Sequence, residues 1–159
     1  MTVRTPLVIV NGQIEQLQSG DSLSNTVNLP VFTNGESSAT IVIGMPVYIS
    51  SADTVKMCKG SGIATVNPVG FMQSTSVSTG NTGSVQLTGN ISATTAQWDA
   101  VCTGESGGLT AGTLYYLDPI AFGKITVTAP TSVGQVVQQV GIAISTTEMK
   151  IDIKIPILL

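Results

Sequence analysis

The chain has 159 residues, a net charge of −3 and no histidine, and only 9% of its residues are charged, against about 25% in ordinary soluble domains. The length is too small for more than one domain of ordinary size. The absence of histidine excludes any catalysis or metal binding that relies on that residue. The composition also argues against a direct nucleic-acid partner, because binding to phosphates needs clustered Lys and Arg side chains.

The weak charge has two further consequences. Copies of the chain repel one another little, so we expect a homo-oligomer. The apolar runs are the length of strands and fall well short of the roughly 18 residues that a membrane-spanning helix needs, so we expect no membrane partner. The first ten residues lack the pattern of a signal peptide, which favours synthesis in the cytoplasm.

The start of the chain predicts a β-hairpin. Leu7 to Val10 is followed by Asn11-Gly12, the favoured pair for a tight hairpin turn, and then by Gln13 to Gln18. Polar residues after this segment indicate a connector. We therefore assign residues 1–30 to an N-terminal arm for attachment or oligomerisation. Its candidate contact residues are Arg4, Leu7, Ile9, Ile14 and Leu17.

Residues 31–159 predict one compact all-β domain, either a β-barrel or a β-sandwich. Short apolar runs recur between turn signals, and the abundant Val and Thr residues prefer extended backbone. Cys58 and Cys102 are far apart and form no metal motif, so we expect two buried, reduced thiols.

One phrase occurs twice, as Gly44-Met-Pro-Val-Tyr-Ile-Ser and as Gly112-Thr-Leu-Tyr-Tyr-Leu-Asp. We interpret the two copies as pseudo-repeats over about residues 39–89 and 107–159. Because neither half buries much surface alone, we expect the two repeats to share one core. The segments that match after each copy are Val69 to Met72 with Val140 to Ala143, and Val85 to Thr88 with Ile151 to Lys154.

Residues 94–101 predict the one short helix, between the repeats. Thr94 and Gln97 have the spacing of a capping box. Trp98, the only tryptophan, is expected to anchor this helix to the body, with ligand stacking as the alternative. Tyr48 and Tyr116 fall at matching places in the repeats, which favours a shared packing role; a carbohydrate-stacking surface is the alternative.

The C-terminal residues predict a half-buried strand. Met149, Ile151, Ile153, Ile155 and Ile157 alternate with polar residues and would share one face. Pro156, which has no N–H group, should lie near the strand end or on a free edge.

No catalytic constellation is present in the sequence. The nine acidic residues are scattered and fall mostly at predicted turns, where they would be solvated or cap the backbone; a calcium site formed by two surface loops is the alternative. The glycine-rich segments lack the remaining residues of nucleotide-binding motifs. We therefore expect a non-enzymatic protein without a cofactor.

Two stretches carry a resemblance to a known class of proteins. Pro6 to Leu17 resembles a phrase near the start of tailed-bacteriophage virion proteins. The second stretch, from Gly108 to the end, is similar to a module of phage head-decoration proteins and of head or tail fibres. Its matching segments are Gly108 to Leu117, Gly123 to Thr126, Ala129 to Thr131, Gln139 to Ala143 and Ile155 to Leu159.

The resemblance implies a virion structural protein. The small size favours a capsid decoration, or cement, protein, which would bind the major capsid protein at the capsid surface, form a trimer and strengthen the shell. The alternative is a head or tail fibre or fibre-adaptor subunit. A third hypothesis is a carbohydrate-binding module that recognises the host through Tyr48, Tyr116 or Trp98.

Overall fold

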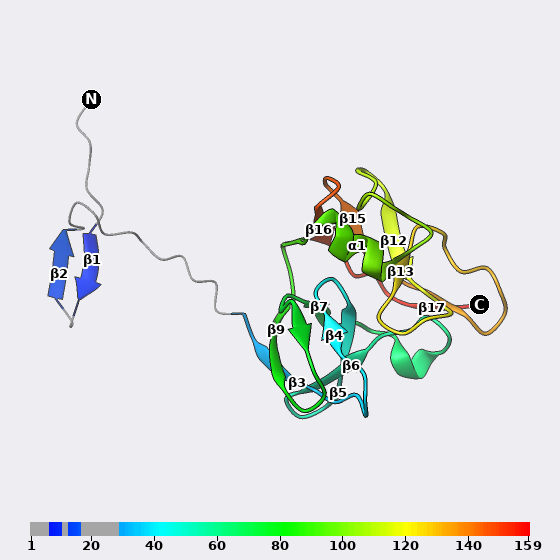
Figure 1. Ribbon diagram of the computed structural model, residues 1–159, viewed down its shortest axis with the longest axis horizontal. Helices are drawn as coiled ribbons and strands as arrows, with labels where there is room; N and C mark the ends of the chain where they lie inside the picture. Colours follow the sequence, from blue (N-terminus) through cyan, green and yellow to red (C-terminus); the bar gives the residue numbers. More distant parts are fainter. Residues whose placement is uncertain (1–6, 11–12, 17–28) are drawn as a thin grey trace.

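A computed structural model describes residues 7–10, 13–16 and 29–159 (Figure 1). Strands predominate in this part of the chain, together with α1 (Thr95–Val101) and the 3-10 helix η1 (Ile63–Thr65), which confirms the predicted all-β fold with one short α-helix. Neither helix has the length and apolar character needed to cross a membrane. The strands are β1 (Leu7–Val10), β2 (Gln13–Gln16), β3 (Val31–Asn34), β4 (Ile41–Val42), β5 (Pro46–Ser51), β6 (Thr54–Met57), β7 (Gly70–Met72), β8 (Ser76–Val77), β9 (Thr82–Gln86), β10 (Asn90–Ser92), β11 (Cys102–Thr103), β12 (Leu114–Leu117), β13 (Ile125–Thr126), β14 (Val136–Val137), β15 (Gln139–Ala143), β16 (Glu148–Ile151) and β17 (Ile157–Leu158).

β1 and β2 form the predicted N-terminal hairpin. They pair antiparallel, with Leu7 opposite Gln16 and Val10 opposite Gln13. The turn predicted at Asn11-Gly12 lies outside the described residues. Within the described part of the chain the two strands form a sheet of their own. A lone two-stranded hairpin has only marginal stability in water, so this hairpin would gain from a further partner.

The first repeat, together with β3 before it, forms a closed five-stranded barrel. The strand order is β3-β6-β5-β7-β9, and β3 closes the barrel by pairing back with β9. Because successive side chains in a strand point to opposite faces, one set of apolar residues fills the interior. The buried members of this cluster are Val47, Val55, Met57, Met72 and Val85 from the barrel strands, together with Ile41 of β4 and Val77 of β8, which pair in a separate two-stranded sheet.

The second repeat, together with β10 and β11 before it, forms a six-stranded sheet with the same pairing scheme. Its order is β10-β16-β15-β12-β13-β11. In the first repeat β5 pairs with β7, and Val47 lies opposite Gly70. In the second repeat β12 pairs with β15, and Tyr115 lies opposite Gly141. β6 and β13 occupy the other sides of β5 and β12. The repeated phrase therefore forms the central strand of both sheets.

The same pair of backbone hydrogen bonds begins both central strands. Gly44 and Gly112 have φ angles of 83° and 80°, a left-handed conformation that favours glycine. Gly44 N–H donates to the Met72 carbonyl at 2.9 Å, and Gly112 N–H donates to the Ala143 carbonyl at 2.8 Å. Each acceptor residue donates its own N–H back to the residue after the glycine, at 2.9 and 3.0 Å. We call this arrangement the glycine clasp.

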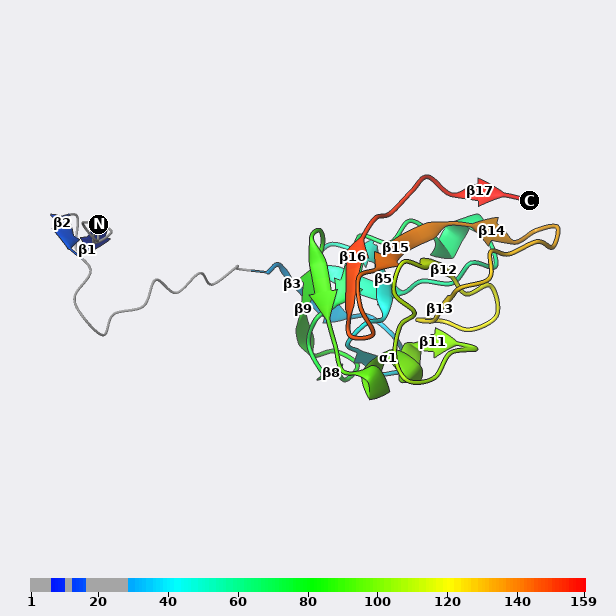
Figure 2. The same ribbon diagram turned by 90° about the horizontal axis from the view of Figure 1, so that it is seen from above.

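Helix α1 interrupts the second sheet at the place where the first sheet closes. β3 pairs with both β6 and β9, whereas their counterparts β13 and β16 pair with two separate strands, β11 and β10. α1 lies between these two strands along the chain and beside β11 (Figure 2). The second sheet therefore corresponds to the first barrel opened by an inserted helix.

The repeats share only one of the two hydrophobic clusters. The larger cluster takes most of its members from the second repeat, but it also includes Cys58, Val66 and Phe71 from the first. The first barrel has its own interior. The expectation of one shared core is thus corrected. Each repeat builds its own sheet, and the buried side chains of the first repeat that lie outside the interior cluster of the barrel pack with the second sheet.

The match between the third segments of the repeats also needs correction. The sequence comparison aligned Val85 with Ile151. The strand pairing places Val85 opposite Met72 and Met149 opposite Ala143, so Val85 corresponds to Met149. Both side chains are fully buried. The loops that precede these strands differ in length, so apolar character alone could not set the alignment.

The predicted C-terminal strand ends earlier than expected. β16 ends at Ile151, and only Met149 of the predicted face is buried, whereas Ile155 and Ile157 are 86% and 60% exposed. The last residues instead pair with β14 as β17. Pro156 lies directly before β17, where its missing N–H group interrupts no ladder. Between β16 and β17 the chain keeps two backbone hydrogen bonds to β15, from Asp152 N–H to the Val140 carbonyl and from Lys154 N–H to the Gln139 carbonyl, but it forms no regular strand.

The close approach of β7 to β9 depends on glycine. A Cβ atom on Gly70 would lie 2.2 Å from the Gln86 carbonyl oxygen. Because backbone cannot yield as a side chain can, we expect Gly70→Ala to lower the free energy of unfolding by about 3 kcal/mol, the upper part of the range for overpacking. Urea denaturation measures this change.

Gly62→Ala is the matched control, because nothing lies within 4 Å of the Cβ position there. Its free energy of unfolding should stay within about 1 kcal/mol of the original value. A Gly70→Ala protein as stable as this control would contradict the strand packing described above.

Candidate functional site

Trp98 joins α1 to both repeats. The helix begins with the predicted capping box: Gln97 N–H donates to Thr94 Oγ1 at 3.2 Å, and Thr94 N–H donates to Gln97 Oε1 at 2.8 Å. The Trp98 side chain is fully buried, and its Nε1 donates to the Thr147 carbonyl at 3.0 Å. A Cβ atom on Gly44 would lie 3.0 Å from the indole ring. The indole therefore lies against the first glycine clasp and exposes no face to a ligand.

Tyr48 and Tyr116 hold equivalent positions in β5 and β12. Tyr48 lies opposite Lys56, and Tyr116 lies opposite Thr126. Both tyrosines are half-buried, and Tyr48 packs partly against the larger hydrophobic cluster. Burial raises the pKa of Tyr48, and the nearby Glu36 carboxylate raises it further. The Tyr48 phenol is therefore protonated at neutral pH.

Tyr115 has a different environment from its neighbour. It is fully buried, its hydroxyl donates to the Glu105 carboxylate, and it accepts the Thr110 N–H at 2.8 Å. The Thr110 hydroxyl also donates to Glu105, at 2.9 Å. Burial raises the pKa of Tyr115, and the hydrogen bond to Glu105 adds to this shift. These contacts stabilise the loop before β12.

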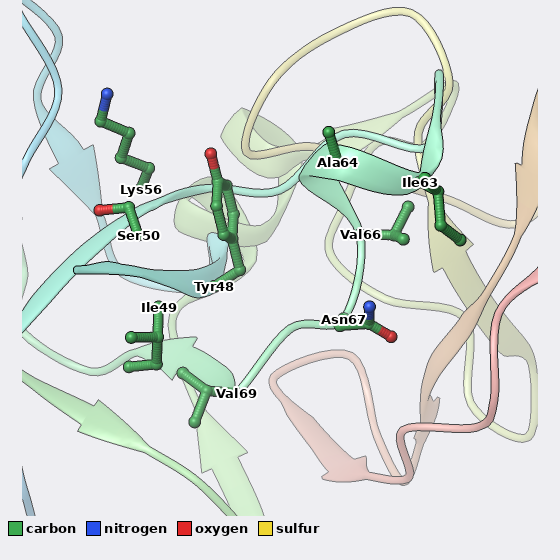
Figure 3. A pocket seen from close by; sticks show the side chains of 9 residues that line it. All are labelled: Tyr48, Ile49, Ser50, Lys56, Ile63, Ala64, Val66, Asn67 and Val69. Carbon is green, nitrogen blue, oxygen red and sulfur yellow. The ribbon is translucent and has the colours of Figure 1, made fainter. Parts of the chain in front are cut away.

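An open pocket of about 620 Å³ lies beside Tyr48. Strands β5 and β6 supply one wall, and η1 with the segment after it supplies the other. Figure 3 shows the Tyr48 ring between Lys56 and Ser50 on one side and Ala64 and Asn67 on the other. The pocket thus combines one aromatic ring with a cation, a hydroxyl and an amide.

The second wall of this pocket is held from behind by the second repeat. Asn67 N–H donates at 2.9 Å to Oε1 of the buried Gln138, whose Nε2 donates to the Lys154 carbonyl at 3.0 Å. Val69 N–H donates to the Val47 carbonyl at 2.8 Å. Asn67 has a φ angle of 66°, a conformation that asparagine tolerates better than most residues. Its backbone is therefore fixed while its side chain stays exposed.

The carboxylates of the body serve mainly as backbone caps. Asp118 Oδ1 accepts the N–H groups of Ile120 and Ala121 at 2.6 and 2.9 Å, and Asp99 accepts those of residues 107–108 at 3.1 and 2.7 Å. Burial alone would raise the pKa of Asp118, but the hydrogen bonds that it accepts outweigh burial and lower it. In the part of the chain that the structure describes, no group of three metal-binding side chains is close enough to hold an ion.

Apolar side chains lie uncovered around the last strand, β17. Val133 is 94% exposed, and Ile157 and Leu158 are 60% and 59% exposed. Because neighbouring residues in a strand point to opposite faces, neither face of β17 is covered. Within residues 29–159, β17 pairs only with β14, and Figure 2 shows it at the margin of the body. We define the C-terminal apolar edge as Val133, Ile155, Ile157, Leu158 and Leu159.

The arm residues named from the sequence have no described side chains. Leu7, Ile9 and Ile14 lie in β1 and β2, for which the backbone pairing alone is described. Arg4 and Leu17 lie outside the described residues. Their proposed role in attachment stays a prediction.

The sequence reasoning missed the companions of Tyr48 in its pocket. A hairpin that turns at Ala52-Asp53 would by itself place Tyr48 opposite Met57; a register shift between Ile49 and Ser51 brings it opposite Lys56, so this pairing had only a partial signal in the sequence. Asn67 had none, because its position depends on Gln138, which lies far away along the chain.

Comparisons of the chain with protein-family models, with curated proteins and with solved structures find no match.

Cys58 and Cys102 are free and buried, as predicted. Burial raises the pKa of both thiols, to about 12 for Cys102, where Glu105 and Asp99 add to the effect. Because the thiolate is the reactive form, the folded protein should resist iodoacetamide at pH 8. In guanidinium chloride both thiols should react. Mass spectrometry counts the labels, and rapid labelling of either thiol in the folded protein would contradict the burial described here.

Proposed function

We propose that this protein is a non-enzymatic structural component of a bacteriophage virion, and specifically a capsid decoration protein. It binds the outer shell as an oligomer, contacts the major capsid protein and stabilises the capsid. The resemblance of its two stretches to virion proteins supports this proposal. The structural observation that carries it is the C-terminal apolar edge, which a protein acting alone in water would be expected to cover.

The C-terminal apolar edge has the properties of a surface for a second copy of the chain. An exposed apolar edge strand offers unpaired backbone groups and apolar side chains together, which favours pairing with another chain. Lys154 and Asp152, close to this edge along the chain, form an ion pair at 2.7 Å. Because their charges cancel, the pair repels a second copy of the chain only weakly. Contacts at this edge would build the oligomer.

The N-terminal hairpin supplies a second means of attachment. β1 and β2 have unsatisfied outer edges within the described strands, and edge pairing with a capsid subunit would stabilise them. Each arm has few residues, so a single contact is weak. An oligomer on a symmetric shell repeats that contact, and linked weak contacts bind far more tightly than any one of them.

Deleting residues 1–20 tests the arm. All the strand pairs of the body lie within residues 29–159, so the shortened protein should still show the strand signal of the body in circular dichroism. We expect it to lose binding to undecorated capsids in a co-sedimentation assay, whereas the full chain binds. Unchanged capsid occupancy by the folded, shortened protein would eliminate the arm as the attachment element.

The double variant Ile157→Asp/Leu158→Asp tests self-association. Each substitution removes an apolar side chain worth about 1.5 kcal/mol or more when buried, so the dissociation constant between copies should rise about a hundredfold. Sedimentation velocity measures this constant.

Ile144→Asp is the matched control. Ile144 is 48% exposed and directly follows the last residue of β15. The C-terminal tail contacts the opposite end of that strand, where Lys154 N–H donates to the Gln139 carbonyl. This variant should associate like the original protein. Equal weakening by the control, or no weakening by the double variant, would exclude the C-terminal apolar edge as the contact surface.

A further inference from the structure

The pocket beside Tyr48 is a concave site that the fold does not use. Its volume of about 620 Å³ lies within the range of small-molecule sites, roughly 300–1,000 Å³. It is open, and its lining sets an aromatic ring, an ammonium, a hydroxyl and an amide among apolar side chains (Figure 3). Such a lining suits a ligand that has both an apolar face and many hydroxyl groups.

We propose that this pocket binds a saccharide that carries an acidic group. The proposal is independent of the capsid role, because no residue that lines the pocket belongs to the C-terminal apolar edge or to the arm. Sugar rings present C–H groups on one face, which pack against an aromatic ring, and hydroxyl groups around the rim, which bond to polar side chains.

Three side chains supply the required groups. The half-buried Tyr48 ring gives a rigid packing surface with a hydroxyl at its end. Ser50 and Asn67 are both exposed at the rim, where they can donate and accept hydrogen bonds with sugar hydroxyls. Because Gln138 fixes the Asn67 backbone, little ordering is needed when a ligand binds.

Lys56 selects for the acidic group. It is the only charged residue that lines the pocket, and it forms no ion pair among the described residues. The Glu36 carboxylate, which acts on the pKa of Tyr48, accepts the Met57 N–H at 2.8 Å and does not line the pocket. An ammonium in a partly desolvated site favours a carboxylate ligand through a charge-assisted hydrogen bond.

The second repeat provides an internal comparison. Where Lys56 lies opposite Tyr48, Thr126 lies opposite Tyr116 in an otherwise equivalent strand pair. The duplicated scaffold therefore forms without a cation at this position. A packing role explains a tyrosine in both repeats, but it does not explain the lysine, the exposed Asn67 or the open space between them.

An oligosaccharide array tests the proposal with the full chain. The array carries sugars that end in glucuronic, galacturonic or N-acetylneuraminic acid beside sugars that end in glucose or galactose. We expect binding to at least one acidic terminus and weaker binding to the neutral termini. Binding to none of these sugars, or equal binding to acidic and neutral termini, would overturn the proposal.

Variants locate the binding on the molecule, with titration calorimetry on the best acidic oligosaccharide as the readout. Tyr48→Ala should weaken binding about tenfold or more, as loss of an aromatic contact does, while Tyr116→Ala at the equivalent position should not. Lys56→Gln should remove the preference for acidic termini, while Lys150→Gln on the exposed face of β16 should keep it.

Asn67→Gly keeps the test decisive if Tyr48→Ala does not fold. Glycine adopts the left-handed conformation of residue 67 without strain, so this variant removes the amide and leaves the backbone in place. We expect a severalfold loss of affinity with an unchanged melting temperature. Unchanged affinity in both Asn67→Gly and Lys56→Gln would place any saccharide binding elsewhere.

Discussion

Two backbone hydrogen bonds at a left-handed glycine set the register of each repeat, and the rest of the body is built on them. The glycine clasps at Gly44 and Gly112 fix β5 against β7 and β12 against β15. Gly44 also makes room for Trp98, because the indole fills the space that a side chain at residue 44 would need. The clasp of the first repeat is therefore also the point at which α1 binds the two repeats together.

Comparison of the two repeats distinguishes the features that both sheets share from the features that occur only once. Both repeats need the clasp, the facing glycines Gly70 and Gly141 and the buried pair Val85 and Met149. Neither needs the N-terminal hairpin, the tail after β16 or the cation at Lys56. These three additions account for the proposed attachment, self-association and ligand binding. The proposed functions thus rest on the departures from the repeat rather than on the repeat.

The sequence predicted local structure well, but it predicted poorly the features that depend on contacts between distant segments. The hairpin strands, the capping box at Thr94 and the buried thiols follow from neighbouring residues, and they agree with the structure. Between β16 and β17 the strand-like alternation continues in the sequence where the structure has no regular strand, and Ile155 and Ile157 are exposed rather than buried as predicted. Closure of the first barrel and the pocket at Tyr48 depend on contacts between distant segments, which a single sequence does not encode as a local pattern.

In the proposed role, the C-terminal apolar edge joins copies of the protein and the arm binds a capsid shell that repeats the same contact many times. Locating the protein on intact virions tests this claim most directly, either by immunogold labelling or by electron cryomicroscopy with a labelled chain. The account predicts many copies distributed regularly over the capsid surface. A few copies confined to the tail or to one vertex would contradict it and favour a fibre or fibre-adaptor subunit.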